Sequence, residues 1–245
     1  MIASRWREKL IGNRLRIIEL RKTPITDPPV KMFGTDILQD MTRTFPRNHW
    51  FLKHMENITM LLNSYAYTNS AMGYAQGMAF IVFILYKTFH EDIPKYALQD
   101  TYYAFHRIVG VIRPIYPLGS HDLGPQDFIR SINQLIYMKL AIHDTPLACR
   151  LKTMEQLVTI IILQCLPALF SNKFKSIEDG QILFDYIFSK ESVTMFNRII
   201  NVFAAILIHF RPIIMSMEEE KVMQLMQVQD YYKARKIIAT AYAID

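Results

Sequence analysis

Two short segments in the first third of the chain place polar and charged side chains at spacings that suit chemistry. The first is ILQDMTRTFP, residues 37–46, in which Asp40 and Arg43 are separated by two residues. On a helix, side chains at this spacing share one face, so a carboxylate and a guanidinium would stand side by side. Taken alone, the pair is better explained as a surface ion pair, which contributes little to stability.

The second segment is YAQGM, residues 74–78, which leads into the apolar run MAFIVFILY, residues 78–86. Gln76 is a long amide side chain placed beside Gly77, at the start of a helix whose composition predicts burial. An amide both donates and accepts hydrogen bonds. In isolation, Gln76 is therefore explained as a helix-capping residue or as a satisfied amide of the core.

Other common catalytic and binding patterns are absent from the sequence. There is no G-x-G-x-x-G, no G-x-x-x-x-G-K-[ST] and no G-x-S-x-G, so no phosphate-binding loop and no nucleophile elbow is predicted. The histidines are dispersed and none belongs to an H-E-x-x-H motif. The pairs His121-Asp122 and His143-Asp144 lie in turn-like sequence, where surface or capping roles are expected rather than metal binding.

Together the two segments are far more specific than either alone. The pattern Ile37-x-x-Asp40-x-x-Arg43-Thr44-Phe45-Pro46, followed by Tyr74-x-Gln76-Gly77-Met78, resembles the TBC domain of Rab GTPase-activating proteins. Weaker similarities extend along the chain. Trp6 with Leu10-Ile11-Gly12 resembles the family's opening block, and GQILFDYIF, residues 180–188, resembles its Ile-Trp-Asp segment with Phe184 in place of Trp. Ala75 stands where the family usually has Cys.

The resemblance implies a catalytic contribution made in trans. Arg43 would be an arginine finger that stabilises charge on the transferring phosphoryl group, and Gln76 a glutamine finger that orients the attacking water. Asp40 would hold Arg43 in place through a salt link or hydrogen bond. The supporting residues would shape the segments around the two fingers; they are Ile37, Thr44, Phe45, Pro46, Tyr74 and Gly77.

The implied function is that of a GTPase activator rather than an enzyme with its own substrate. Its partner would be a Rab-family GTPase in the GTP-bound state, and GTP and magnesium would belong to that partner, so the chain itself would need no cofactor. We expect a cytoplasmic protein that regulates vesicle trafficking and reaches endomembranes only through the GTPase. A catalytically silent scaffold with the same fold remains the alternative.

Composition independently favours an all-α fold, a single multi-helix domain of roughly ten helices. The chain has 8 glycines among 245 residues, about half of the usual ~7%, whereas sheet proteins need many glycine turns. Apolar residues recur every three to four positions, for example at Ile129, Ile132, Ile136 and Leu140, which is typical of an amphipathic helix. The run VTIIIL, residues 158–163, is expected to be helical despite its β-branched residues.

The expected organisation is one TBC domain over residues 1–245. Residues 5–215 carry the resemblance, residues 1–36 form a shortened lead-in, and residues 216–245 form C-terminal helices. The arginine segment is expected to be a short helix over residues 36–44, capped by Asp36 or Thr35. Proline and glycine mark two connectors, residues 20–36 and 112–125.

Charge and cysteine content limit the remaining possibilities. Lys and Arg number 28 against 22 Asp and Glu, and the whole excess of +6 lies in residues 1–53. This basic flank suggests faster encounter with an acidic GTPase surface; without an aromatic platform or a recognised motif, nucleic-acid binding is not expected. Cys149 and Cys165 are too few for a disulfide framework or a four-cysteine zinc site, and both are expected to be buried.

Overall fold

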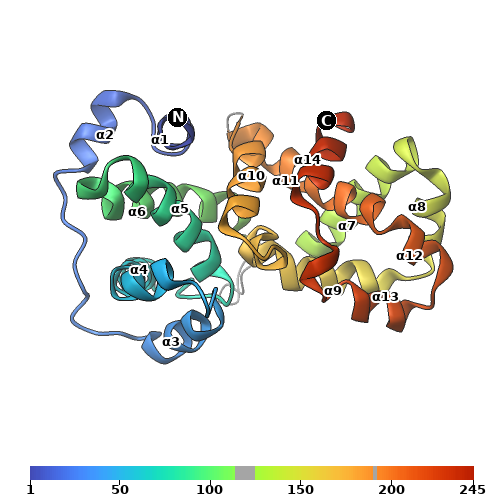
Figure 1. Cartoon of the computed structure of the whole chain (residues 1–245), viewed down its shortest axis with the longest axis horizontal. Coiled ribbons are helices and arrows are strands. Elements are labelled where there is room, and N and C mark those ends of the chain that lie inside the picture. Colours follow the sequence, from blue (N-terminus) through green and yellow to red (C-terminus); the bar gives the residue numbers. More distant parts are fainter. Residues whose placement is uncertain (114–124, 190–191) are drawn as a thin grey trace.

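The computed structural model describes residues 1–113, 125–189 and 192–245, and these residues form fourteen α-helices and no strand. The expected all-α fold is therefore confirmed. Figure 1 shows an elongated molecule, with the first six helices at one end and α7, α8, α9, α12 and α13 at the other. Helices α10, α11 and α14 lie between these two groups.

The first half of the chain provides the helices that carry both sequence motifs. In chain order they are α1 (Ile2–Leu10), α2 (Arg14–Leu20), α3 (Gly34–Arg43), α4 (His49–Thr68), α5 (Met78–Asp92) and, after the 3₁₀ turn η1 (Pro94–Tyr96), α6 (Ala97–Ile112).

The second half contains eight more α-helices and several 3₁₀ turns. In chain order these elements are α7 (Pro125–His143), α8 (Thr145–Lys152), α9 (Glu155–Cys165), η3 (Leu166–Ala168), η4 (Ser171–Lys173), α10 (Ile177–Ile187), α11 (Ser192–His209), α12 (Arg211–Ser216), α13 (Glu219–Leu225), η5 (Gln229–Tyr231) and α14 (Ala234–Ala243).

Two strongly apolar helices form the centre of the core. Along α5, the side chains from Ile81 to Leu85 are fully buried, and on α11 the buried run extends from Val202 to Leu207. A helix that is apolar on nearly all sides must be covered by neighbours. Helix α5 packs against α4, α6 and α10, and α11 packs against α6, α7 and α14, so the core is continuous from one end of the molecule to the other.

Helix α1 is fixed to the core by an aromatic and a polar contact. Trp6 is 1% exposed and packs edge-on against Phe89 and Phe188. Its indole Nε1 donates a hydrogen bond of 3.3 Å to Asp185, which also accepts a hydrogen bond of 2.9 Å from the Arg5 guanidinium. The Asp185 that the sequence comparison singled out therefore connects α1 to α10.

A buried ion cluster joins α1 and α2 to α6. Asp100, 1% exposed, accepts a 2.5 Å bond from Arg7 and bonds of 2.6–2.8 Å from Arg21. Arg7 also pairs with Asp92 at the end of α5. The hydrogen bond to Asp100 raises the pKa of Arg21. The expected lead-in, residues 1–36, thus contains two docked helices.

Several finer predictions need correction. Helix α3 begins at Gly34 rather than residue 36, and its N-cap is Phe33, with no side-chain cap from Thr35 or Asp36. The described helices outnumber the expected ten, because Pro212 and the turn at Met217 divide the C-terminal region further. Cys165 is buried, as expected, whereas Cys149 is exposed on α8. Most of the connector at 112–125, together with His121-Asp122, lies outside the described residues.

Replacing Asp100 with alanine should lower the free energy of unfolding by about 3–5 kcal/mol, because it removes the carboxylate shared by Arg7 and Arg21 and leaves the buried Arg7 guanidinium with Asp92 alone. Glu19→Ala, which removes only the exposed Lys22–Glu19 pair, should cost less than about 1 kcal/mol. Urea denaturation of both variants measures the difference. A similar fall in the free energy of unfolding for the two variants would show that the buried cluster contributes no more to stability than a surface ion pair.

Candidate functional site

Asp40 is the polar centre of the region that contains both motifs. It lies on α3 with only 3% of its surface exposed. Its Oδ2 accepts the backbone N–H of Gly77 at 2.8 Å and also the hydroxyl of Tyr74. One carboxylate oxygen therefore holds the turn that carries Gln76, and it ties this turn to the helix that carries Arg43.

The backbone of the glutamine turn requires glycine at position 77. Gly77 has φ +100°, and a Cβ at this position would lie 3.2 Å from both the Cβ and the backbone nitrogen of Ala168. Glycine alone accepts such a conformation without strain. The turn thus passes directly against η3, and Gln76, the preceding residue, is left exposed at the start of α5.

Arg43 stands at the last turn of α3 with its side chain in solvent. Its Nε donates to the carbonyl of Gln39 at 3.2 Å, which directs the side chain back along its own helix. Within the described part of the chain, no carboxylate lies within ion-pair distance of Arg43. The guanidinium is therefore available to an incoming anion.

The residues that follow Arg43 anchor the end of α3. Thr44 is fully buried, and its hydroxyl donates to the Asp40 carbonyl at 2.9 Å. Phe45 has φ +45°, a strained value for a phenylalanine, and its ring packs 5.4 Å from Phe80 and 5.1 Å from Phe83. The segment after Arg43 is thereby attached to α5, the helix that begins directly after Gln76.

A cavity of about 440 Å³ opens beside the glutamine turn. Asp40, Gln76, Gly77 and Phe80 form one side of it. The other side comes from the C-terminal half of the chain and is largely polar; its residues are Leu163, Gln164, Asn172, Lys173 and Gln227. The candidate site therefore lies where the two halves of the molecule meet.

The structure brings most of the predicted residues together but changes the role of one. Ile37 is fully buried on the inner face of α3, Tyr74 and Gly77 bond to Asp40, Thr44 and Phe45 anchor the end of α3, and Pro46 is exposed after it. The expected link from Asp40 to Arg43 is not formed. Asp40 is instead turned inward toward the glutamine turn, because the buried N–H of Gly77 needs an acceptor.

The C-terminal wall of the cavity was not predicted. Gln164, Lys173 and Gln227 show no spacing in the sequence that would associate them with Gln76. The nearest signal is Pro167, which ends α9 in a run that otherwise reads as one apolar helix. Proline cannot donate the helical hydrogen bond, so the chain turns there and brings the next residues toward Gly77.

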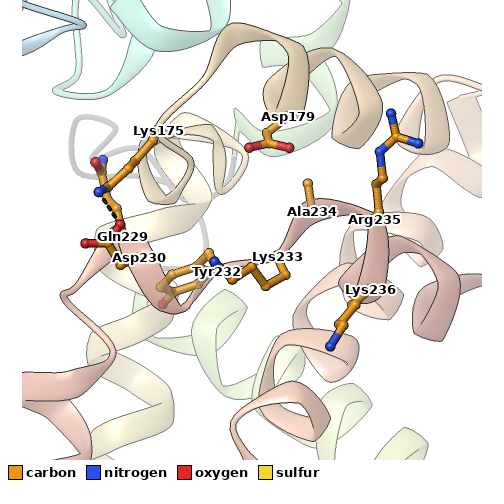
Figure 2. Close-up of a pocket in the computed structure, with 9 residues that line it drawn as sticks. All are labelled: Lys175, Asp179, Gln229, Asp230, Tyr232, Lys233, Ala234, Arg235 and Lys236. Atoms are coloured by element: carbon orange, nitrogen blue, oxygen red, sulfur yellow. Dashed lines mark ion pairs between the residues drawn. The ribbon is translucent and has the colours of Figure 1, made fainter.

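A second, basic cavity of about 430 Å³ lies at the start of α14, away from Arg43 and Gln76. Figure 2 shows Lys175 paired with Asp230 on one side of it, and Arg235 and Lys236 on the first turn of the helix. The hydrogen bond from Lys175 lowers the pKa of Asp230. None of the predicted site residues lines this cavity.

Comparison with known proteins agrees with the resemblance seen in the sequence. The profile of the Rab-GTPase-TBC domain matches residues 15–215. The chain belongs to this family. The solved structure of the Ypt/Rab-GAP domain of Gyp1p superimposes with a TM-score of 0.69, covering 99% of this chain and 79% of that chain at 16% sequence identity. This TBC protein therefore has the Rab-GAP fold. No curated protein matches the chain in sequence.

Among the described residues, no single helix is long and apolar enough to span a membrane; only the bent pair Thr145–Lys152 and Gln156–Ala168 satisfies that test, by length and composition alone. In the same residues, no group of three or more His, Cys, Asp or Glu side chains is placed to hold a metal ion.

Replacing Asp40 with alanine should destabilise the protein by about 2–3 kcal/mol, because the N–H of Gly77 and the hydroxyl of Tyr74 lose their acceptor. Asp40→Asn keeps a carbonyl oxygen in place and should reduce the stability by less than Asp40→Ala does. Asp36→Ala, at an exposed position on the same helix, is the matched control. Thermal unfolding of the three variants checks the order, and equal stability of Asp40→Ala and Asp36→Ala would contradict the anchoring role.

Proposed function

We propose that this TBC protein accelerates GTP hydrolysis by a Rab-type GTPase, with Arg43 and Gln76 as the two groups supplied in trans. Membership in the family supports a GTPase activator with a Rab partner. One observation carries the finer proposal: Asp40 joins the helix of Arg43 to the turn of Gln76, while both of these side chains remain exposed. Two exposed polar groups on one rigid support can act together on a docked partner.

Arg43 acts on the charge that develops during phosphoryl transfer. The transition state spreads negative charge over the transferring group and the bridging oxygen, and a guanidinium placed there stabilises it. The planar donor set of arginine suits phosphate oxygens better than the point charge of lysine. With no carboxylate paired to it among the described residues, Arg43 can turn to the nucleotide without first breaking an ion pair.

Gln76 acts on the nucleophile. Its amide oxygen accepts a hydrogen bond from the attacking water, and its amide nitrogen donates a hydrogen bond to the transferring phosphate, so the water is held in line for attack. Orientation of this kind requires a side chain whose backbone does not move. Gly77 supplies that rigidity through its bond to Asp40 and its close approach to Ala168.

The nucleotide and its magnesium ion are proposed to come with the GTPase. This TBC protein has no phosphate-binding loop in its sequence, and the residues around Gln76 offer amides and one lysine rather than a set of cations. The GTP-bound GTPase would then be the form that binds productively. We further propose action in the cytoplasm, in vesicle trafficking, with membranes reached through the GTPase.

The silent scaffold is the second candidate. It would bind a GTPase with the same surface but would need neither the exposed guanidinium nor a rigid glutamine turn. The buried acceptor beneath Gly77 and the strained Phe45 beside Arg43 are features that a mere binding surface does not require. These observations favour the activator.

Arg43→Ala should lower the maximal stimulated hydrolysis rate by roughly 10³-fold or more while the fold remains intact. The measurement is single-turnover GTP hydrolysis against a panel of Rab GTPases. Arg47→Ala, an exposed arginine four positions further on, is the matched control and should retain activity. Stimulation by Arg43→Ala at the wild-type rate would refute the mechanism.

Gln76→Ala should lower the maximal rate by about 10²–10³-fold even when the GTPase keeps its own catalytic glutamine. The same assay is repeated with a GTPase variant in which that glutamine is replaced. If the wild-type activator still stimulates this GTPase variant, Gln76 supplies the missing amide. If Gln76→Ala impairs only reactions of the glutamine-deficient GTPase, the glutamine of the activator is redundant and the assignment is wrong.

A further inference from the structure

Lys173 is a buried cation in the wall that faces Gln76 across the cavity. It ends the 3₁₀ turn η4, and it is 5% exposed. Its Nζ donates to Oε1 of Gln227 at 2.9 Å and to the carbonyl of Met226 at 3.4 Å. Both acceptors are neutral, so these bonds orient the ammonium without cancelling its charge.

No anion compensates Lys173 within the described part of the chain, where its Nζ forms no ion pair. Two titratable side chains close to it, Cys165 and Tyr232, are uncharged at neutral pH. Burial raises the pKa of the Cys165 thiol to about 12, and burial raises the pKa of Tyr232, whose ring centre lies 6.0 Å from Nζ. Burying an unpaired ammonium is costly, so a partner that brings a negative charge would gain affinity.

The wall around Lys173 is held in a fixed conformation. Leu169 and Phe170, two consecutive residues before η4, have φ values of +48° and +61°. Non-glycine residues rarely adopt this region, and strain of this kind persists only where the surroundings enforce it. Here the N–H of Phe170 donates to the carbonyl of Cys165 at 2.8 Å, and the ring packs against Phe203.

The neighbouring amides form a hydrogen-bond network around Lys173, in which the buried Oδ1 of Asn172 has no partner. Gln227 donates from Nε2 to Oε1 of Gln164 at 2.7 Å, and Asn172 donates from Nδ2 to the carbonyl of Gln164 at 2.9 Å. The network fixes Gln227, which in turn orients Lys173. A preorganised wall with one uncompensated charge is suited to receive a single charged group.

We propose that Lys173 binds an acidic side chain of the GTPase. This side chain enters the cavity while Gln76 contacts the nucleotide. This inference rests on the proposed function. The lining of the cavity carries one cation, Lys173, and one carboxylate, Asp40, which is already engaged by Gly77 and Tyr74. A carboxylate of the GTPase fits a single cation better than a nucleotide phosphate does, because polyphosphates are usually held by several positive groups. A cavity of about 440 Å³ has room for such a side chain.

The role of Lys173 is recognition rather than chemistry. A carboxylate held on this wall makes the same contact before and during hydrolysis, so it changes binding without changing the barrier. Lys173 would thus help to determine which GTPases are accepted, in favour of those with an acidic residue at the docking position.

The test is single-turnover hydrolysis with Lys173→Met, using a GTPase that the wild-type protein stimulates, at a series of activator concentrations. Methionine keeps the length of the side chain and removes the charge. The half-saturating concentration should rise about tenfold while the maximal rate stays unchanged. The melting temperature should stay the same or rise, because the variant no longer buries an unpaired charge.

Lys175→Met is the matched control. Lys175 lies two residues away, is exposed and pairs with Asp230 at the other cavity (Figure 2). Its half-saturating concentration should remain that of the wild type. Lys173→Arg, which keeps the charge, should recover part of the lost affinity, and Lys173→Gln, which keeps a donor for the two carbonyls, should not.

Three results would overturn the inference. An unchanged half-saturating concentration for Lys173→Met means that no charged group of the GTPase is bound there. A fall in maximal rate at unchanged half-saturation means that Lys173 acts on the nucleotide. Loss of folding in both Lys173→Met and Lys173→Gln means that the residue is structural. Failure of the wild-type protein to stimulate any GTPase would instead overturn the proposed function, and this inference with it.

Discussion

The buried carboxylate of Asp40 is the interaction on which the site depends. A glycine N–H and a tyrosine hydroxyl, both on the turn before α5, converge on one of its oxygens, and the helix that supplies it ends at Arg43. A buried N–H without an acceptor is costly in free energy. The glutamine turn and α3 therefore cannot separate without a large loss of stability. The positions of Arg43 and Gln76 are therefore coupled, although no bond joins these two side chains.

The sequence predicted the residues of the site better than their contacts. The roles of Arg43 and Gln76 stay predictions from the resemblance of their two segments to the family, whereas the helix after Gln76 followed from its apolar run and is confirmed. The predicted partner of Asp40, Arg43, was wrong. Helical spacing indicates which residues share a face of the helix, but it does not indicate that Asp40 points into the protein toward the glutamine turn. The wall with Lys173 was missed, because it depends on Leu169 and Phe170 in a left-handed conformation that no local preference of leucine or phenylalanine indicates.

The basic N-terminal region has a more divided role than its net charge suggests. Of its eleven Lys and Arg residues, five are paired with carboxylates: Arg5, Arg7, Arg21, Lys22 and Lys31. Arg7 and Arg21 are structural, since they hold α1 and α2 against α6. The other six form no ion pair in the described structure; they include Arg43 and Arg47 at the candidate site and Lys9, Arg14 and Arg16 on α1 and α2.

The cavity beside Gln76 is built from segments that are distant in sequence. Asp40 and Gly77 lie in the first third of the chain, whereas Lys173 and Gln227 come from the last third. Contacts of such long range form late, because a long loop must close before they contribute. A folding intermediate with only its N-terminal helices in place would already display Arg43, but it would lack half of the docking surface. The cavity beside Gln76 is therefore complete only when the whole domain has folded.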